Sequence, residues 1–527
     1  MAALLLYFSA LGVCLLVLRY LRSTWYHAQK AQEWNCAPIP RYPTDILGIG
    51  TLKESVQADK QGLVPPLLGY RLERMRAREG RDVTTFSVTQ MGRKNIFTCD
   101  PHNVQAILAT KFKDFELGPI RQHTLLPLLG TGIFTSDGEI WSRSRALLRP
   151  QFTREQISDL DLEERHVQQA MLAMPVDATT GWTAATDIQA IFFRLTIDSA
   201  TEFLFGESAG SQAEALRNGG QLPPNNFPAY FDRAQWYAAH RSRFEKLHWI
   251  VDNKESRHVA REVHAYVDRF VAAALSGAAV AAPGKPRSSS TYVFLDAIVA
   301  STQDPVELRA QLLNILLAGR DTTASFLSWS VLMLARHPKI FHTLRLAILD
   351  DFGPYTSSSS SAPQDKPITF QSLKSCRPLQ NFMSEVLRLY PVVPINRRVA
   401  ARDTFLPRGG GPDGTRPVYI HAGQAIIYSP FITQRRKDLW GEDAETFNPD
   451  RWAGRKVGWE YLPFNGGPRV CIGQQFALTE AGYVLVRLLQ RFDAMQDVFP
   501  ERAVRFASSL TSAPKDAVTV RLHEAER

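Results

Sequence analysis

Residues 304–337 place the strongest constraint on how this chain can fold. Asp304 and Pro305 suit the N-cap and the first position of a helix, and Pro338 ends the pattern. From 312 to 334 the segment is apolar nearly all round, so a helix here must be covered on most of its faces. A long helix that is buried in this way needs other helices packed around it. The segment therefore predicts a large and mainly helical body.

The rest of the chain completes this picture. Apolar residues recur at helical spacing over 183–205, 227–250 and 256–276, whereas strand signals lie in the last third, over 417–420 and 425–428. Hydrophobic residues make up 45% and charged residues 21% of the chain, which allows a sizeable core and excludes a mostly disordered protein. We predict an α+β fold, mainly α with small β-sheets.

The N-terminal segment is apolar and is followed by basic residues. Residues 2–18 carry no charge, and Arg19, Arg22 and Lys30 come next. This length is at the short end for a bilayer span, and basic residues on its C-terminal side favour a cytosolic body. A cleaved signal peptide is the alternative, but neither a basic start nor a clear cleavage site supports it. We predict three parts: a transmembrane anchor over 1–20, a basic and proline-rich hinge over 21–45 and a single large domain over 46–527.

Cysteine usage and net charge exclude several classes of protein. The five cysteines are far apart, odd in number and free of any CxxC pair: Cys14, Cys36, Cys99, Cys376 and Cys471. This pattern argues against a disulfide framework and a zinc finger, and it agrees with a reducing compartment. The net charge of +9, from 61 Lys and Arg against 52 Asp and Glu, is spread along the chain. Because nucleic-acid binding needs a clustered patch, no nucleic-acid partner is expected.

Cys471 ends a glycine-rich loop directly before a predicted helix. The loop reads FNGGPRVCIG over 464–473, and the helical pattern QQFALTEAGYVLVRLLQRF follows. Backbone N–H groups of the loop and the dipole of the helix would both stabilise a thiolate. Such a thiolate could be a nucleophile, a redox thiol or a metal ligand, and an inert buried cysteine is the alternative. A nucleophile would need a histidine base, and this segment contains none.

The pattern FxxGxRxCxG in this loop resembles the haem-binding loop of the cytochrome P450 family, with every fixed position present. The resemblance implies a cytochrome P450 fold, with one large haem domain behind an N-terminal transmembrane helix. It implies that the Cys471 thiolate is the axial ligand of the haem iron, a ligand that favours O–O cleavage. It also implies that Phe464 packs near the sulfur and that Arg469 reaches a haem propionate.

Two further motifs resemble those that support the haem in this family. Glu385 and Arg388 match ExxR, and Arg451 in the later segment FNPDRW fits the arginine that joins this pair and locks the core. On its own, ExxR at i and i+3 on a helix would be an ordinary ion pair of little value. Trp141 and Arg145 match WxxxR, so the resemblance implies contact with a propionate, which arginine binds in a bidentate fork. The last of the implied propionate contacts is Arg398.

The segment Ala318–Thr323, inside the long apolar helix, reads AGRDTT and matches the family pattern (A/G)Gx(D/E)T(T/S). Polar and charged groups inside a buried helix are costly unless they are partnered or functional. The resemblance implies that Thr322 hydrogen-bonds oxygen on the distal face of the haem and that Asp321 relays protons. The alternative is a kinked core helix whose threonine hydroxyls bond back to the preceding turn.

Longer strings over 127–152, 191–208, 312–329 and 464–480 resemble the fungal branch that hydroxylates alkanes and fatty acids. The resemblance implies terminal (ω) hydroxylation of a long aliphatic chain by a monooxygenase on the endoplasmic reticulum membrane, with its catalytic domain in the cytosol. The expected partners are O2, a hydrophobic substrate and NADPH–cytochrome P450 reductase, with cytochrome b5 as a further candidate. Oxidation of a fungal specialised metabolite, a polyketide or terpenoid, stays open. A haem-thiolate rearrangement enzyme and a non-catalytic haem sensor are less favoured, since neither needs the Asp321–Thr322 pair.

Overall fold

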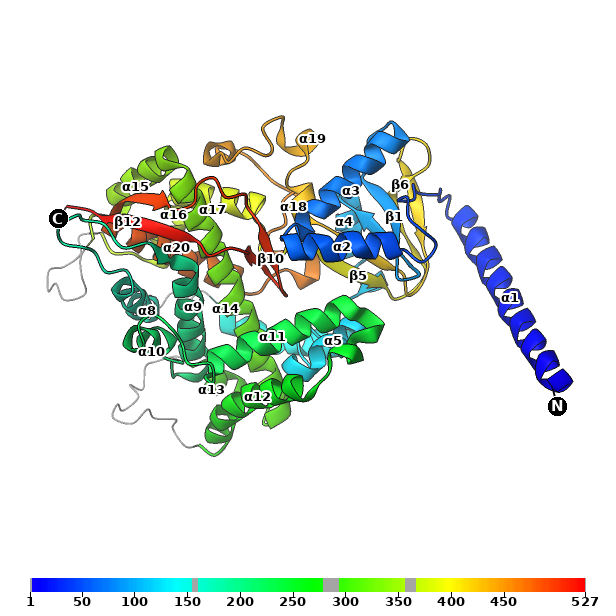
Figure 1. The fold of residues 1–527 in the computed structure, drawn as a ribbon, viewed down its shortest axis with the longest axis horizontal. Helices are drawn as coiled ribbons and strands as arrows, with labels where there is room; N and C mark the ends of the chain where they lie inside the picture. Colours follow the sequence, from blue (N-terminus) through cyan, green and yellow to red (C-terminus); the bar gives the residue numbers. More distant parts are fainter. Residues whose placement is uncertain (1, 154–159, 278–292, 356–365, 527) are drawn as a thin grey trace.

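The computed structural model describes residues 2–153, 160–277, 293–355 and 366–526, and the long helix α14 (Pro305–Arg336) runs through the middle of the body (Figure 1). The Asp304 side chain accepts a hydrogen bond from the Val306 N–H at 2.9 Å, which caps the first turn. The helix ends at Arg336, before Pro338. The prediction of a long, buried helix with these ends is confirmed.

Helices from both halves of the chain surround α14. α9 (Ile188–Phe205) packs along it most extensively, and α12 (Lys254–Leu275), α17 (Arg377–Leu389) and α20 (Gln474–Arg491) also contact it. The other α-helices are α1 (Ala2–Glu33), α2 (Ile49–Gln61), α3 (Val64–Glu79), α4 (Pro101–Gln105), α5 (Pro119–Leu129), α6 (Gly138–Leu148), α8 (Asp161–Leu172), α10 (Ser211–Arg217), α11 (Phe227–Phe244), α13 (Phe294–Val299), α15 (Pro338–Phe352), α16 (Phe370–Ser375), α18 (Pro430–Thr433) and α19 (Lys437–Trp440). Short helical turns are η1 (Ala106–Thr110, of π type), η2 (Phe112–Asp114), η3 (Arg149–Phe152), η4 (Glu245–Val251), η5 (Pro449–Trp452) and η6 (Gly467–Arg469).

Within the described part of the chain, the strands form four small sheets. The largest has the order β1-β2-β8-β5-β3, in which β2 and β8 are parallel and the other neighbours are antiparallel. Its strands are β1 (Thr85–Gln90), β2 (Arg93–Thr98), β3 (Phe115–Glu116), β5 (Asn396–Ala400) and β8 (Ala425–Tyr428). The others are β4 (Thr186–Asp187), β9 (Phe492–Asp497) and β12 (Thr519–Glu524) in one sheet, β6 (Thr404–Gly410) with β7 (Arg416–Ile420), and β10 (Phe506–Ser508) with β11 (Ser512–Pro514). The predicted strands are thus confirmed as β7 and β8, but β1 and β2 show that strands are not confined to the last third.

Two hydrophobic clusters meet along α14. One cluster includes the buried residues of its first half up to Leu317, with side chains from α5, α9, α11, α12 and α13. The other cluster includes the buried residues of α14 from Ala324 onward, with side chains from α3, α8, α15, α17 and α20. The polar segment Ala318–Thr323 therefore lies at the junction of the two clusters. A functional group at this point is supported by apolar packing on both sides.

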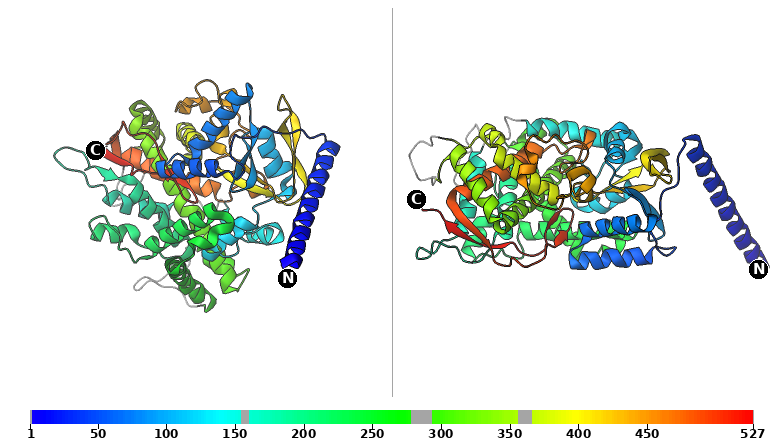
Figure 2. Two further views of the ribbon diagram at one scale, coloured as in Figure 1. Left: turned by 45° about the vertical axis from the view of Figure 1, so that its right-hand side comes forward. Right: turned by 90° about the horizontal axis from the view of Figure 1, so that it is seen from above.

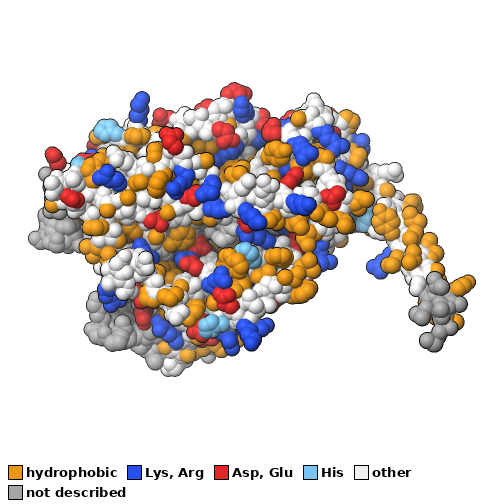
Figure 3. Space-filling view, in the orientation of Figure 1, with side chains coloured by type: hydrophobic (Ala, Val, Ile, Leu, Met, Phe, Trp, Pro, Cys, Tyr) orange, Lys and Arg blue, Asp and Glu red, His pale blue; other side chains and the backbone are white. Residues whose placement is uncertain are grey.

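The N-terminal helix α1 stands away from the body and carries exposed apolar side chains along its length (Figures 1, 2 and 3). It continues through the predicted anchor boundary at residue 20 and into the predicted hinge, ending at Glu33. Near this end it contacts the β6–β7 hairpin, where His27 Nδ1 lies 2.9 Å from the Tyr419 hydroxyl and the Trp34 ring packs against Phe405.

The prediction of a transmembrane anchor over 1–20 is not supported. Among the residues that the structure describes, no helix combines the length and the apolar character that crossing a bilayer requires.

Candidate active site

Backbone contacts and close packing hold the loop that carries Cys471. Its N–H donates a hydrogen bond to the Phe464 carbonyl oxygen at 3.0 Å, just before α20 begins. Gly467 has a φ of 66°, and a Cβ atom there would lie 1.9 Å from the Leu108 carbonyl oxygen of η1. Because only glycine tolerates both conditions, this position fixes the loop against η1. Phe464 is half-buried and packs against the main hydrophobic cluster.

The Cys471 side chain is exposed, although the protein surrounds it closely. Desolvation is the largest influence on its pKa and raises it, whereas the Gly473 N–H and the Arg145 guanidinium act in the opposite direction. The Gly473 N–H at the start of the helix favours a thiolate, but desolvation by the surrounding protein atoms outweighs it. A metal ion bound to this sulfur would favour the thiolate form, because its positive charge opposes the effect of desolvation.

A cluster of arginines lies beside this loop. The Arg469 guanidinium donates to Asp137 Oδ1 at 2.7 Å and to the Ser136 carbonyl oxygen at 3.0 Å, and it lies 4.3 Å from the centre of the Trp141 ring. Arg145 lies 6.0 Å from the same ring. Burial, together with neighbouring arginines, lowers the pKa of Arg469 to about 10. The buried Nε of Arg469 has no hydrogen-bond partner among the described residues.

Arg398 and Arg121 complete this arginine cluster, which comprises Arg121, Arg145, Arg398 and Arg469. Arg398 on β5 is buried, donates to the Arg397 carbonyl oxygen at 2.9 Å and lies 5.8 Å from the Tyr428 ring. Burial and then the charge of Arg398 lower the pKa of Arg121 to about 10. Sequence reasoning missed Arg121. The available signal was a lone arginine close to an apolar segment, and it was too weak to single the residue out.

The arginine cluster carries more positive charge than its protein contacts neutralise. Asp137 is the carboxylate bound by Arg469, and its oxygens also accept hydrogen bonds from the N–H groups of Leu117 and Gly118 at 2.9 and 3.1 Å. Like charges at short range in a buried setting are costly unless an anion is present. The arginines, the orphaned Nε of Arg469 and the thiol of Cys471 beside Arg145 fit a cofactor that carries both a metal and carboxylates.

Glu385 and Arg388 of the ExxR motif lie together with Arg451 of the later FNPDRW segment. Glu385 and Arg388 on α17 are fully buried and form a bidentate pair with distances of 2.8 and 2.9 Å. Arg451 Nε lies 3.3 Å from Glu385 Oε1, and Arg451 also pairs with Asp443 at 2.7 Å. Arg388 also donates to the carbonyl oxygen of Gln434 at 2.8 Å. This group ties α17 to the segment that precedes the Cys471 loop.

The polar segment of α14 places its two predicted site residues in different environments. The Thr322 hydroxyl donates to the Ala318 carbonyl oxygen at 2.5 Å, which is the back-bonded geometry that the alternative interpretation of this segment predicted. Asp321 is almost completely buried and accepts a hydrogen bond from Arg320 at 2.9 Å. Burial raises the pKa of Asp321 to about 6, against the opposing effect of Arg320. A carboxyl group in this state can hold or release a proton close to neutral pH.

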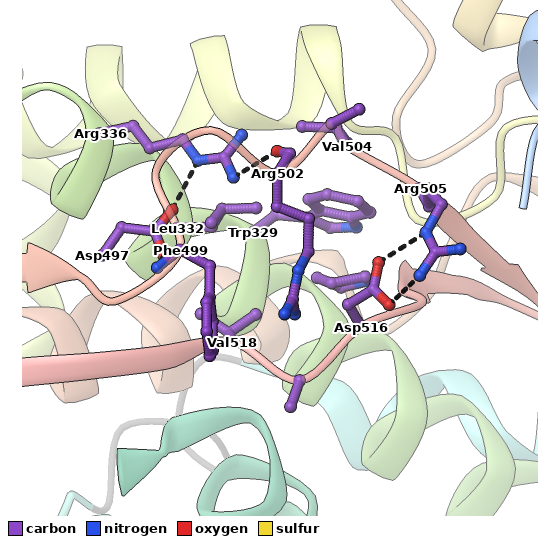
Figure 4. A pocket seen from close by; sticks show the side chains of 13 residues that line it. Trp329, Leu332, Arg336, Asp497, Phe499, Arg502, Val504, Arg505, Asp516 and Val518 are labelled. Carbon is purple, nitrogen blue, oxygen red and sulfur yellow. Dashed lines mark hydrogen bonds and ion pairs between the residues drawn. The ribbon is translucent and has the colours of Figure 1, made fainter. Parts of the chain in front are cut away.

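A separate pocket at the C-terminal end of α14 contains none of the predicted site residues (Figure 4). Trp329 lines it, and ion pairs flank it: Arg336 with Asp497 at 2.8 Å and Arg505 with Asp516. The Arg336–Asp497 pair joins α14 to β9, and the Arg505–Asp516 pair lies within the C-terminal segment, so the pocket belongs to the structural framework.

Comparison with known proteins defines the class. The sequence profile of the cytochrome P450 family matches residues 72–517. The chain is 48% identical over 506 residues to cytochrome P450 monooxygenase g430 of Fusarium sp, covering 94% of this chain and 86% of that protein. It is 42% identical over 499 residues to cytochrome P450 52A13 of Debaryomyces hansenii, covering 93% and 92%. The crystal structure of a cytochrome P450 haem domain shares the fold, with a TM-score of 0.74 and 21% identity over 93% of this chain and 98% of that one.

The chain therefore belongs to the cytochrome P450 family. It is an oxidoreductase, a cytochrome P450 monooxygenase, and its cofactor is haem bound through a cysteine thiolate. The predictions of family, enzyme class, cofactor and a mainly helical fold with small sheets are confirmed. Such an enzyme works with a reductase as redox partner, O2 and a hydrophobic substrate.

Proposed function

We propose that Cys471 is the thiolate ligand and that the arginine cluster with Trp141 holds the propionates of the haem. The observation that supports this assignment is the position of Cys471, which lies beside the half-buried Arg145 and in the same cluster as Arg469 with its orphaned Nε. When bound there, the haem supplies the activation of O2. The guanidinium groups bind and orient its carboxylates. Glu385, Arg388 and Arg451 keep the supporting segment in place.

Asp321 and Thr322 are proposed to deliver protons on the distal side. The hydroxylation R–CH3 + O2 + 2 electrons + 2 protons gives R–CH2OH + H2O, so two protons must reach a site that is closed to bulk water. Asp321 holds a proton on its carboxyl group, and burial keeps its pKa in the range where transfer is efficient. The Thr322 hydroxyl donates its hydrogen to the Ala318 carbonyl oxygen, and by rotating it can donate this hydrogen to the O2 substrate instead.

The first test is spectroscopic. The reduced protein with CO is expected to give the Soret shift that is typical of a thiolate ligand, and Cys471→Ser is expected to lose it. Cys376→Ser, which changes a buried cysteine outside the site, is the matched control and should keep the shift. Retention of the shift in Cys471→Ser would contradict the assignment of this ligand.

The proposed substrate is a long-chain alkane or fatty acid, hydroxylated at or near its terminal carbon. Half-buried apolar side chains pack at the edge of the cluster around the first half of α14, including Ile472 directly after Cys471 and Ile133, Phe134 and Leu510 from other segments. Such surroundings suit an aliphatic chain. The resemblance to the alkane and fatty-acid branch of the family supports the same substrate class.

The substrate proposal is tested by product analysis. Membranes that contain the enzyme, a reductase and NADPH are incubated with alkanes, fatty acids and fungal polyketides or terpenoids, and the products are identified by mass spectrometry. Terminal alcohols from the aliphatic chains are the expected result. Turnover of only a polyketide or terpenoid would assign the enzyme to specialised metabolism instead.

NADPH–cytochrome P450 reductase is the proposed electron donor, with cytochrome b5 as an additional one. Arg149 is exposed and lies close enough to Arg145 for its charge to help lower the Arg145 pKa, so it extends the positive charge from the site to the surface. An acidic partner surface would be attracted there. Arg149→Glu is expected to slow haem reduction and weaken its salt dependence, whereas Arg78→Glu, another exposed arginine, is not. Equal rates in both variants would contradict this docking face.

Attachment to the endoplasmic reticulum membrane through α1, with the body in the cytosol, is proposed from the exposed apolar side chains of this helix. Leu15, Leu16 and Trp25 are 58%, 68% and 67% exposed. Replacing Leu15 and Leu16 with Asp is expected to release the protein from the membrane fraction, which immunoblotting of fractionated cells would show. The matched control replaces both with Ala. Unchanged sedimentation of the Asp variant would contradict attachment through α1.

A further inference from the structure

Arg320, the neighbour of Asp321 in α14, is shared between two helices. It is 4% exposed, and its guanidinium contacts both Asp321, at 2.9 Å, and Asp232 of α11. The ring of Phe193 from α9 lies 4.9 Å from the guanidinium. The buried Nε of Arg320 has no hydrogen-bond partner among the described residues. One buried cation therefore serves two carboxylates that come from different helices.

The two carboxylates are not equivalent. The Asp232 side chain is 57% exposed, whereas the Asp321 side chain is 6% exposed. Water can solvate Asp232 when it leaves Arg320, but Asp321 has no such alternative. Gln235, which is one turn after Asp232 in α11, is buried near Asp321 and lowers the pKa of that carboxyl. Asp232 thus reaches Asp321 only through the shared Arg320, and Gln235 lies beside Asp321.

The position of α11 makes this contact informative. α11 packs chiefly against α12, η4 and α5. Near Asp232, its link to α14 is the contact between the side chains of Asp232 and Arg320. The pairing of Asp232 with Arg320 therefore does not follow from close packing of the two helix backbones. Water competes for the exposed carboxylate of Asp232, which limits what this pair adds to stability while Arg320 keeps its second partner Asp321.

We propose that Asp232 is a positioning residue for Asp321: by sharing Arg320, it prevents this arginine from pairing with Asp321 alone and so keeps Asp321 able to carry a proton. The inference rests on the proposed role of Asp321 in proton delivery. It gives a role to a residue outside the AGRDTT motif. It also makes the protonation of Asp321 in α14 depend on a side chain of α11.

The electrostatic signs agree with this role. The Asp321 pKa, about 6, is raised first by burial and also by the negative charge of Asp232, and it is lowered by Arg320 and Gln235. The groups that act on Asp321 are Arg320 on its own helix and Asp232 and Gln235 on α11, while the apolar ring of Phe193 on α9 packs against Arg320. Glu480 of α20 interacts with the nearby Thr323, and burial raises its pKa to about 7. Removing the charge of Asp232 must therefore lower the pKa of Asp321.

The test uses Asp232→Asn in the full-length, haem-loaded protein. Infrared difference spectra of protein labelled with 13C-aspartate follow the protonated carboxyl band against pH, and Asp321→Asn assigns the band. The midpoint of this band is expected to fall by about one pH unit in Asp232→Asn. Asp232→Glu, which keeps the charge, should restore it. Glu255→Gln is the matched control, because it breaks an ion pair with Arg233 of α11 but leaves Arg320 untouched.

The second readout is the amount of product formed for each NADPH consumed. Its decline at high pH is expected to begin at lower pH in Asp232→Asn than in the wild type or Glu255→Gln, since Asp321 loses its proton earlier. An unchanged infrared midpoint in Asp232→Asn overturns the inference, whatever the turnover. A shifted midpoint with undiminished coupling in Asp321→Asn would keep the link between Asp232 and Asp321, and it would reject the proposed role of Asp321 in proton delivery.

Discussion

The Cys471 loop and the polar segment of α14 are both parts of one site, but they are held in different ways. Cys471 is placed by its own segment, through its N–H bond to Phe464 and the close approach of Gly467 to η1. Asp321 is placed by charged side chains, one of which belongs to another helix. The first arrangement is steric and independent of pH. The second responds to protonation and to the position of α11.

The largest expected effect concerns the framework on the Cys471 side. Glu385→Ala leaves the buried Arg388 without its bidentate partner and weakens the bonding of Arg451. Breaking a buried ion pair on one side costs about 3–5 kcal/mol of the free energy of unfolding, which denaturant titration would measure. Lys437→Ala, which removes an exposed pair with Glu442, is the control and should change stability very little. Equal stability of the two variants would show that this framework tolerates charge loss.

The steric nature of the Cys471 loop is tested at Gly467. Gly467→Ala combines a left-handed backbone with a clash against the Leu108 carbonyl oxygen. Gly454→Ala is the matched control, since Gly454 has a φ of 71° but a Cβ atom there would meet nothing within 4 Å. We expect Gly467→Ala to be less stable than the control by about 2 kcal/mol or more in denaturant titration, and to bind less haem. A similar loss in both would mean that only backbone strain matters here.

The pH sensitivity of the α14 side is tested at Glu480. This carboxyl on α20 accepts a hydrogen bond from Ser199 of α9 at 2.7 Å, and burial raises its pKa to about 7. Since the folded state holds this proton more tightly than the unfolded state, stability should fall as pH rises from about 4.5 to about 7. Over this pH range, the free energy of unfolding of Glu480→Gln is expected to fall by about 2–3 kcal/mol less than that of the wild type. Unfolding measured at several pH values would show the difference.

Glu73→Gln is the control for Glu480, because Glu73 is an exposed carboxylate on α3. It should leave the pH dependence of stability unchanged. If the Glu480 variant kept the wild-type pH dependence, the α14 side would be no more sensitive to protonation than the Cys471 loop, and the contrast between the two regions would be lost.

The smallest expected effect is at Arg121, which sequence reasoning missed. Arg121→Gln removes one member of the arginine cluster and should speed the loss of haem to apomyoglobin about tenfold, the size of one charge-assisted hydrogen bond. Arg402→Gln is the control, because Arg402 is an exposed arginine that pairs with Asp114. Equal rates of haem loss would limit the cluster to Arg145, Arg398 and Arg469.

Sequence analysis succeeded where neighbouring residues determine the structure. Asp304, Pro305 and Pro338 fix the ends of α14, and the glycine-rich loop with its following helix identifies Cys471. These signals are local, because capping, turns and apolar periodicity act over a few residues. The motif partners Glu385 and Arg388 are one turn apart and are equally local.

The misses have physical reasons. Asp232 and Arg320 are 88 residues apart, so no short pattern connects them. The predicted anchor boundary at residue 20 followed the first charges, yet Arg19 and Arg22 are compatible with a helix, and α1 continues to Glu33.

The contact of α1 with the β6–β7 hairpin has a mechanical consequence. A helix of 32 residues is about 48 Å long at 1.5 Å per residue, and aromatic contacts of His27 and Trp34 with this hairpin hold it near one end. Because the helix is this long, a tilt of about 10° at the hairpin would move its far end by about 8 Å. The packing of His27 and Trp34 against Tyr419 therefore sets the angle between the N-terminal helix and the catalytic body.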